Sequence, residues 1–336
     1  MKSVRLAIPG LFLPKDLAAE AGAGLSLPAL EKLLGRGRSE ILYPVPLENL
    51  LCEIFGVSVQ DEAPIAAISA AFDGLDAGCW LRADPVNLHL QRDQLLLAGV
   101  HVGSEEAAAL CATLNAHFAG QGVEFFVPHP QRWYVRPDTM PLMRTTPLSQ
   151  VIGGDVRRVL PTGEDAARWH QLFNEIQMLL HAHPLNEARE ARGEPAINSV
   201  WFWGGGCSEN VALQKNYDSV SSDDMLAGVF ATSSSATFSV WPEKWRDAEN
   251  NGRQLLVWTG LRSALQGGDL AAWRIALQDF ENSYARPIWQ ALRSGSIASL
   301  QIDILGGDSM LRLVLTPADA WAFWRRARRL AEYSMV

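Results

Sequence analysis

One segment near the middle of the chain combines residue types that could bind an anion. Residues 183–206 read HPLNEAREARGEPAINSVWFWGGG and include His183, Asn186, Arg189 and Asn198. Arginine and amide side chains can hold a phosphate or carboxylate group, and a glycine turn offers backbone N–H donors with no Cβ in the way. The segment therefore predicts a cleft for a small phosphorylated or carboxylate ligand. The other interpretation is a buried strand followed by a flexible turn.

The expected elements around this segment are a helix before it and a strand within it. An amphipathic helix should run through residue 181, and Pro184 can begin a turn or a new helix. Residues 200–203 are β-branched and aromatic, which favours a strand, and three glycines follow directly. The candidate ligand-binding residues are His183, Asn186, Arg189, Asn198, Trp201, Trp203, Gly204, Gly205 and Gly206.

The pattern HPxNxxRxxxGxPAxNxxWxWGxG is complete in this segment. It resembles the signature of the archaeal-type, cofactor-independent phosphoglycerate mutases, which are metalloenzymes of the alkaline phosphatase superfamily. Weaker similarity occurs in Leu81-Arg82-Ala83-Asp84, which is similar to that family's FRxN segment. The resemblance extends to bacterial RpfE-type regulators of pathogenicity factors, which implies a regulatory role.

The resemblance implies an α/β fold in which helices flank a mostly parallel sheet. The opening apolar run, residues 3–9, fits the first strand of such a sheet. A helix from Ser104 and strands at 123–127 and 132–135 predict a small α+β insertion. We therefore expect an alkaline-phosphatase-like core from residues 1–89 and 161–336, and an inserted subdomain from residues 90–160. A final helix is expected over 318–333.

The chemistry of the resembled enzymes needs two divalent metals held by Asp and His, and a nucleophilic Ser. All seven histidines of this chain lie between positions 89 and 183, so the C-terminal half offers no imidazole. Asn49 stands where the resembled enzymes have the Ser, and it cannot accept a phosphoryl group as an alcohol would. We therefore predict no catalytic residue and no metal ligand. Carboxylates remain in the C-terminal half at Asp218, Asp223, Asp224, Asp269, Asp303 and Asp308.

Three functions follow from these observations. The first is a catalytically degenerate phosphoglycerate-mutase-like protein with a regulatory or ligand-binding role and no cofactor. The second is an active, metal-dependent phosphoglycerate mutase or phosphatase with a rearranged site. The third is a surface for a protein partner or a homo-oligomer, formed by tryptophans that include Trp321 and Trp324.

Composition narrows the class of protein. With 48% hydrophobic and 20% charged residues in 336, the chain is expected to fold around a large core. The formal net charge of −8 argues against nucleic-acid binding, and no apolar stretch is long enough to span a membrane, so neither is expected as a partner. Four cysteines scattered without metal spacing predict reduced thiols and a cytoplasmic location.

Overall fold

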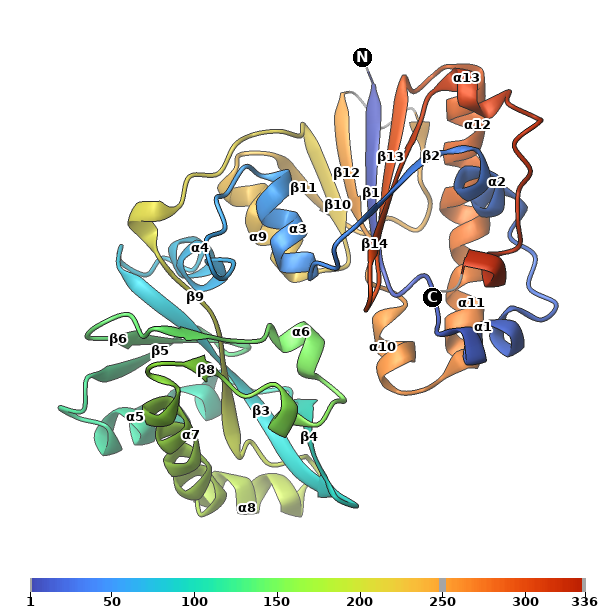
Figure 1. Ribbon diagram of the computed structural model, residues 1–336. Helices are drawn as coiled ribbons and strands as arrows, with labels where there is room; N and C mark the ends of the chain where they lie inside the picture. Colours follow the sequence, from blue (N-terminus) through green and yellow to red (C-terminus); the bar gives the residue numbers. More distant parts are fainter. Residues whose placement is uncertain (1, 248–251, 334–336) are drawn as a thin grey trace. The chain divides into compact units, whose positions relative to one another are not determined.

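The computed structural model describes residues 2–247 and 252–333, and Figure 1 shows its elements. The chain forms two compact units: Met1–Phe55 with Leu213–Val336, and Gly56–Ala212. The expected insertion, 90–160, lies inside the second unit, but the structure places the boundaries near 55 and 212. The difference arises because the strands at 79–91 and 199–207 pair with each other, which keeps both flanks of the expected insertion in one sheet.

The first unit contains a mixed α/β arrangement. In chain order its elements are β1 (Ser3–Pro9), α1 (Lys15–Gly22), α2 (Pro28–Arg36), β2 (Arg38–Leu42), α3 (Leu47–Ile54), β10 (Ser219–Ser222), α9 (Met225–Ser233), β11 (Thr237–Val240), β12 (Arg253–Val257), α10 (Arg262–Gln266), α11 (Leu270–Phe280), η4 (Glu281–Ala285), α12 (Arg286–Ser294), β13 (Ser299–Leu305), β14 (Met310–Leu315), α13 (Pro317–Ala320) and η5 (Leu330–Tyr333).

A seven-stranded sheet organises the described part of this unit, in the order β11-β10-β12-β1-β13-β14-β2. The first five strands in that order are parallel, and β14 and β2 join by antiparallel pairing. Helices α2, α11 and α12 lie on one face of the sheet and α3 and α9 on the other (Figure 1). The predicted mostly parallel α/β sheet with flanking helices is confirmed.

The long helical segment of this unit contains a π-helical turn, η4, between α11 and α12. This turn carries Glu281, whose side chain is fully buried. Its carboxylate accepts the backbone N–H groups of Ala29 and Leu30 at 2.9 Å each, at the start of α2. A carboxylate at a helix N-terminus satisfies donors that have no partner within the helix. Glu281 thus fixes α2 against the α11–α12 segment.

The predicted final helix over 318–333 is wrong. Only α13, Pro317–Ala320, is helical there, and the chain then runs irregularly to η5. The side chains of Ala322 and Leu330 are buried, whereas those of Trp321 and Trp324 are exposed. The apolar residues of this segment therefore do not share one helical face, and packing at separate points replaces a helix.

The second unit is built on antiparallel strands. Its elements are α4 (Ile65–Phe72), β3 (Cys79–Gln91), β4 (Gln94–Gly99), α5 (Ser104–His117), β5 (Val123–His129), β6 (Arg132–Pro137), β7 (Met143–Arg144), α6 (Leu148–Val151), η1 (Val156–Arg158), β8 (Thr162–Gly163), α7 (Ala166–His181), α8 (Pro184–Ala191), β9 (Ser199–Cys207) and η2 (Ser208–Asn210). Strand β3 pairs with β4, β6 and β9 in a five-stranded sheet. None of the helices in the described residues is long and apolar enough to cross a membrane.

The three glycines after Trp203 do not form the expected turn. Gly204, Gly205 and Gly206 belong to β9, which continues to Cys207. Gly204 has φ +67°, a left-handed conformation that favours glycine, and a Cβ on Gly206 would overlap Pro64. Glycine is needed here because the strand bends and passes close to a neighbouring segment.

A buried charge network crosses the sheet of the first unit. Asp303 on β13 is fully buried and accepts from Arg5 Nε and Arg312 Nε, each at 2.6 Å. The same two guanidinium groups reach Glu53 on α3 at 3.0 and 2.7 Å. Since Arg5, Asp303 and Arg312 lie on three adjacent strands, the network fixes the register of β1, β13 and β14.

Replacing Asp303 with Asn should test this constraint. We expect Asp303→Asn to lower the free energy of unfolding by about 3 kcal/mol, because two largely buried guanidinium groups would lose their fully buried carboxylate partner. Glu53→Gln is the matched control, since Glu53 is half exposed and should cost less than about 1 kcal/mol. Denaturant unfolding measures both, and equal losses would contradict the assigned role of Asp303.

Candidate functional site

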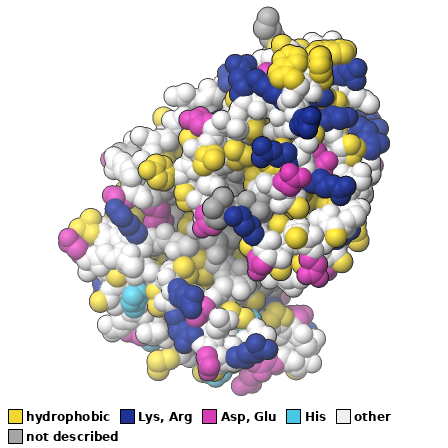
Figure 2. Space-filling view, turned by 45° about the vertical axis from the view of Figure 1, so that its right-hand side comes forward, with side chains coloured by type: hydrophobic (Ala, Val, Ile, Leu, Met, Phe, Trp, Pro, Cys, Tyr) yellow, Lys and Arg dark blue, Asp and Glu magenta, His cyan; other side chains and the backbone are white. Residues whose placement is uncertain are grey.

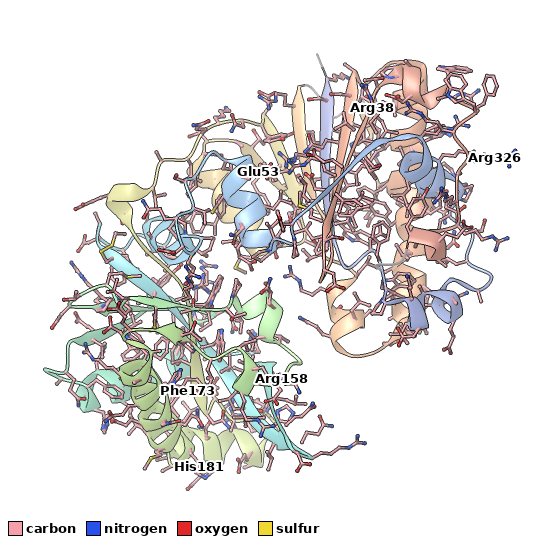
Figure 3. All side chains as sticks on the ribbon, viewed as in Figure 1. Arg38, Glu53, Arg158, Phe173, His181 and Arg326 are labelled. Atoms are coloured by element: carbon pink, nitrogen blue, oxygen red, sulfur yellow. A yellow bond between two sulfur atoms is a disulfide. The ribbon has the colours of Figure 1, made fainter. Side chains whose placement is uncertain are left out.

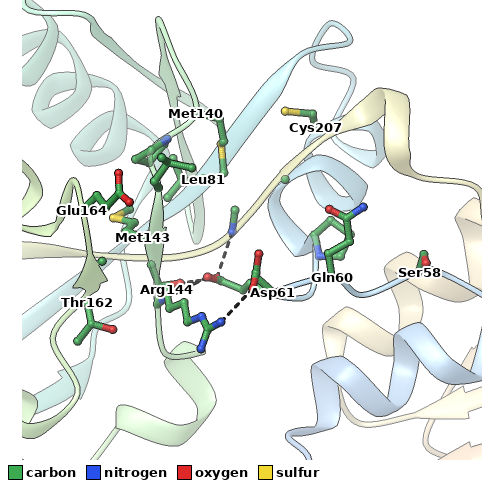
Figure 4. Close-up of a pocket in the computed structure, with 18 residues that line it drawn as sticks. Ser58, Gln60, Asp61, Leu81, Met140, Met143, Arg144, Thr162, Glu164 and Cys207 are labelled. Carbon is green, nitrogen blue, oxygen red and sulfur yellow. Dashed lines mark hydrogen bonds and ion pairs between the residues drawn. The ribbon is translucent and has the colours of Figure 1, made fainter.

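A cavity of about 900 Å³ lies within the second unit. Its walls come from the segment before α4, from the end of β9, and from β7 and β8 (Figure 4). Gly205, Gly206 and Cys207 line it, so the glycine end of the signature segment does border a cavity. His183, Asn186, Arg189, Asn198, Trp201, Trp203 and Gly204 are not among the lining residues.

The backbone donors of the glycine segment already hold an anion, and that anion is the side chain of Glu62. Glu62 Oε1 accepts from the N–H of Gly204 and, at 3.2 Å, from that of Gly205. The hydroxyl of Thr145 also donates to Oε1, and its N–H donates to Oε2 at 3.0 Å. The amides that the sequence offered to a ligand are therefore occupied by a residue of the chain itself.

Burial raises the pKa of Glu62 above its ordinary value of 4.5, while the hydrogen bonds from Thr145, Gly204 and Gly205 act in the opposite direction. The net direction shows that desolvation outweighs the hydrogen bonds. Glu62 is therefore a poorly solvated carboxylate at the base of the glycine strand.

The remaining charges of the cavity are mostly negative. Asp61 and Glu164 line it in addition to Glu62, and Arg144 is the lining residue with a positive charge. Arg144 Nη2 lies 3.0 Å from Asp61 Oδ1 in a solvent-exposed pair, which Figure 4 marks with a dashed line. Apolar surface comes from Leu81, Met140, Pro141, Leu142 and Met143. This combination favours a ligand that is neutral or positively charged over a phosphorylated one.

The two asparagines of the signature segment hold backbone in place. Asn186 is buried, donates to Leu180 O at 2.7 Å and Ile197 O at 2.9 Å, and accepts from Ile197 N at 2.7 Å. Asn198 makes a two-way contact with Leu88, accepting from its N–H at 2.7 Å and donating to its carbonyl at 2.8 Å. Asn186 therefore fixes the path between α7, α8 and β9, and Asn198 fixes the entry to β9 against β3.

The Arg189 side chain also bonds to other residues of the same unit. Its guanidinium pairs with Glu106 at 2.6 Å and donates to the carbonyls of Pro195 and His101 at 2.9 and 3.0 Å. His183 caps α8 by accepting from Leu185 N at 3.2 Å, and its Nε2 lies 3.1 Å from the Thr113 hydroxyl. The structure thus joins α5 and α8 through these side chains, away from the cavity lining.

The tryptophans of β9 anchor the strand through their indole N–H groups. Trp201 donates to Thr146 O at 2.8 Å, and Trp203 donates to Asp84 Oδ2 at 2.7 Å. Asp84 also accepts from Arg82 Nε at 3.1 Å, and both side chains are buried. The segment that resembles FRxN therefore forms an internal ion pair beneath β9.

Cys79 and Cys207 form a disulfide between β3 and β9. The two residues are direct partners in the antiparallel register, and Cys207 lines the cavity. The prediction that all four cysteines are reduced thiols is wrong for this pair, while Cys52 and Cys111 are buried free thiols. The cytoplasmic location inferred from reduced thiols loses that support.

Two carboxylates lie at the carboxyl edge of the parallel sheet, just after β10. Asp223 Oδ1 accepts from the N–H of Thr259 at 2.7 Å and from its hydroxyl at 3.2 Å. Asp224 caps α9 through Leu226 N and Ala227 N and pairs with Arg262 at 3.3 Å. Burial raises the pKa of Asp223. This edge is where open α/β sheets usually bind ligands.

The other carboxylates of the C-terminal half are dispersed. Asp218 accepts from Arg253 N, Asp269 caps α11, Asp303 lies in the charge network and Asp308 is exposed. Within residues 2–247 and 252–333, no three His, Cys, Asp or Glu side chains are grouped to hold a metal ion. The residues present do not fit the dinuclear centre that the resemblance implies.

Sequence reasoning missed Glu62, Thr145 and the pairing of Cys79 with Cys207. Glu62 carries no local signal, because its partners are 83 and 142 residues away in the chain. Arg82 and Asp84 offered a signal, since residues two apart on a strand share a face. The cysteines could have been paired only by knowing that β3 and β9 are neighbours.

Comparisons with known proteins agree with this fold. No family model matches the sequence. A 2,3-bisphosphoglycerate-independent phosphoglycerate mutase of Methanosarcina mazei is 25% identical over 218 residues, which cover 60% of this chain and 55% of that protein. A probable enzyme of the same name from Geobacter sulfurreducens is 26% identical over 201 residues, 55% of this chain and 50% of its own length. The matched region thus spans about half the length of these curated relatives.

Two solved structures share the fold over nearly the whole chain. The PH0037 protein from Pyrococcus horikoshii superposes with a TM-score of 0.59 and 13% identity, covering 98% of this chain and 91% of its own. The cofactor-independent phosphoglycerate mutase of Thermoplasma acidophilum gives a TM-score of 0.50 and 12% identity, covering 100% and 96%. The chain is a divergent protein similar to the cofactor-independent phosphoglycerate mutases. The mutase-like fold is therefore shared, although the residues that would hold metals are not assembled in the described chain.

Chemical labelling should test the disulfide. Unfolded but unreduced protein is expected to label at Cys52 and Cys111 alone, and prior reduction should expose all four cysteines. Reduction should also lower the free energy of unfolding by about 3 kcal/mol, because the link constrains a long loop of the unfolded chain. The Cys79→Ser/Cys207→Ser double variant is the control and should not respond to reductant. Four labelled thiols before reduction would rule out the link.

The raised pKa of Glu62 leads to a pH-dependent stability. An acid whose pKa is higher in the folded state stabilises the fold below its unfolded value of 4.5 and loses that contribution as pH rises through the folded value. Glu62→Gln cannot titrate, so the melting temperature of the wild type relative to this variant should fall as the pH rises above the unfolded value of 4.5. Glu187→Gln, on the exposed face of α8, is the control. A difference that does not change with pH would contradict the assignment.

Proposed function

We propose that this protein has a phosphoglycerate-mutase-like fold that binds a small ligand and does not transfer phosphoryl groups. The main support for the proposal is that the two carboxylates at the carboxyl edge of the parallel sheet already bond to other groups of the protein. Asp224 is held by the α9 N-terminus and Arg262, and Asp223 is held by Thr259. Dinuclear phosphoryl transfer needs carboxylates and imidazoles that converge on open metal positions.

The histidines support this proposal by their distribution. All seven belong to the second unit, 56–212, so the parallel sheet of the first unit has none on its own chain segments. Asn49 lies in the first turn of α3, where the resemblance places the nucleophilic Ser. An amide in that position has no hydroxyl to accept a phosphoryl group.

The ligand that the geometry supports differs from the one the sequence suggested. The expected phosphorylated or carboxylate ligand depended on Asn186, Arg189, Asn198 and the glycine amides, and all of these groups already bond within the protein. The cavity of the second unit instead offers Asp61 and Glu164 beside an apolar, methionine-containing wall. We propose a neutral or cationic ligand with an apolar part as its occupant.

An active metal-dependent mutase or phosphatase remains the second candidate because of Asp223. This carboxylate is poorly solvated, has a raised pKa and stands beside Asp224 at the ligand-binding edge of the sheet. Perturbed carboxylates in such positions often serve catalysis. The regulatory role implied by the RpfE-type resemblance is compatible with the first candidate and needs the same binding site.

One set of assays separates the two candidates. We expect purified protein supplied with manganese to show neither phosphoglycerate mutase nor phosphatase activity, and metal analysis to find no stoichiometric divalent ion. Metal-dependent turnover that disappears in Asp223→Asn and persists in Asp279→Asn, an exposed control near the C-terminal end of α11, would establish the enzyme and contradict the binding proposal.

The cavity is tested independently by ligand binding. Thermal-shift screening should find cationic or neutral amphiphilic compounds that stabilise the protein, while 3-phosphoglycerate has no effect. Asp61→Asn with Glu164→Gln should weaken binding of a cationic compound by about tenfold, equivalent to about 1.4 kcal/mol. Glu187→Gln with Glu190→Gln, both exposed on α8, is the matched control for the loss of two negative charges. Stronger binding of phosphorylated compounds than of cations would contradict the proposed ligand class.

A further inference from the structure

The irregular segment after α13 presents three large aromatic side chains to solvent. Trp321, Phe323 and Trp324 are 57%, 80% and 69% exposed. Arg326, Arg328 and Arg329 follow, all exposed; we call these six residues the aromatic–arginine surface. Figure 2 shows hydrophobic side chains bordered by Lys and Arg at the upper end of the first unit, where α13 lies in Figure 1.

This segment is docked firmly, so the exposure of its aromatic side chains is a feature of the fold. Ala322 and Leu330 are buried at its two ends. Arg325 Nη1 donates to Arg36 O at 2.8 Å and contacts Asp319 Oδ1 at 3.1 Å. Leu330 N donates to Glu31 Oε1 at 3.3 Å. The segment is therefore held against α2 while its aromatic rings point outward.

The positive charge of the surface is local. The first unit has 19 Lys and Arg against 19 Asp and Glu, so it has no net charge of its own. Asp319, the nearest acid in sequence, accepts from Thr316 at 2.7 Å and pairs with Arg325. Arg293 adds a further guanidinium, placed 4.5 Å from the centre of the Trp321 ring. Figure 3 shows Arg326 extending away from the ribbon.

We propose that the aromatic–arginine surface binds the face of an anionic phospholipid bilayer. Tryptophan and phenylalanine partition into the region between headgroups and acyl chains, and arginine binds lipid phosphates. Three rings that project from a docked segment suit insertion into a soft interface. This is peripheral attachment, and it needs no helix that spans the membrane.

Other occupants fit the same surface less well. A symmetric contact with a second copy would bring two sets of Arg326, Arg328 and Arg329 into one interface, which is unfavourable without acidic partners. Single-stranded nucleic acid is bound by parallel stacking on ring faces. Phe323 and Trp324 instead pack edge to face, with centroids 5.3 Å apart and an interplanar angle of 79°.

Vesicle sedimentation with the full chain tests the proposal. We expect binding to vesicles of phosphatidylcholine mixed with phosphatidylglycerol, weakening as salt is added, and no binding to phosphatidylcholine alone. Phe323→Ser/Trp324→Ser should reduce binding about tenfold or more, as should Arg326→Glu/Arg328→Glu. Ile275→Ser is the control, because Ile275 is 64% exposed in the same unit and lies outside the surface.

Four outcomes would overturn the proposal. They are no sedimentation with anionic vesicles, equal binding by the serine double variant and the Ile275→Ser control, equal binding to both vesicle compositions, and loss of a dimer in Phe323→Ser/Trp324→Ser without any vesicle binding. The last result would assign the surface to a second copy of the chain. Circular dichroism and melting temperature of each variant show that it remains folded, so failure to bind cannot be attributed to unfolding.

Discussion

The carboxylate of Glu62, held by the backbone of Gly204, Gly205 and Thr145, is the contact on which the cavity of the second unit depends. It joins the segment before α4 to β9 and to the strand pair β7–β8. An acid in this position fills donors that would otherwise attract a ligand anion, and its poor solvation raises its pKa. The same contact therefore shapes the wall and biases the cavity against phosphate.

The signature segment acts as scaffold in this protein. Asn186 binds backbone of Leu180 and Ile197, Asn198 binds backbone of Leu88 on β3, and Arg189 ties α8 to α5. These contacts need the same residue types at the same spacing whether or not a substrate is bound. A complete motif of polar residues can thus be required by the fold and not by a reaction. This explains how similarity to mutases coexists with carboxylates that do not converge.

The fold class of the first unit could be predicted from local sequence patterns, whereas the candidate site is formed by contacts between residues far apart in the sequence. The first strand follows from its apolar run, and the structure confirms it as β1, Ser3–Pro9. The glycines of β9 led to the wrong prediction of a turn, because glycine occurs both in turns and where two backbone segments approach closely. The contact that requires Gly206 is with Pro64, which is far away in the sequence. Cys79 and Cys207 are separated by 128 residues, and no spacing rule connects them. The final helix failed because its apolar residues pack at separate points rather than along one face.

The division of charge gives the two units different chemical characters. The second unit contains 10 Lys and Arg against 18 Asp and Glu, so it accounts for the whole net charge of −8, and it contains every histidine. An acidic unit repels phosphorylated compounds at long range, and the Glu62 contact repels them at short range. The first unit has the sheet edge suited to ligands but lacks imidazole. Arg262, which lies at that edge, pairs with Asp224, and other arginines surround buried Asp303 or form the aromatic–arginine surface. The placement of charge therefore supports the proposed ligand class, a neutral or cationic compound, over a phosphorylated one.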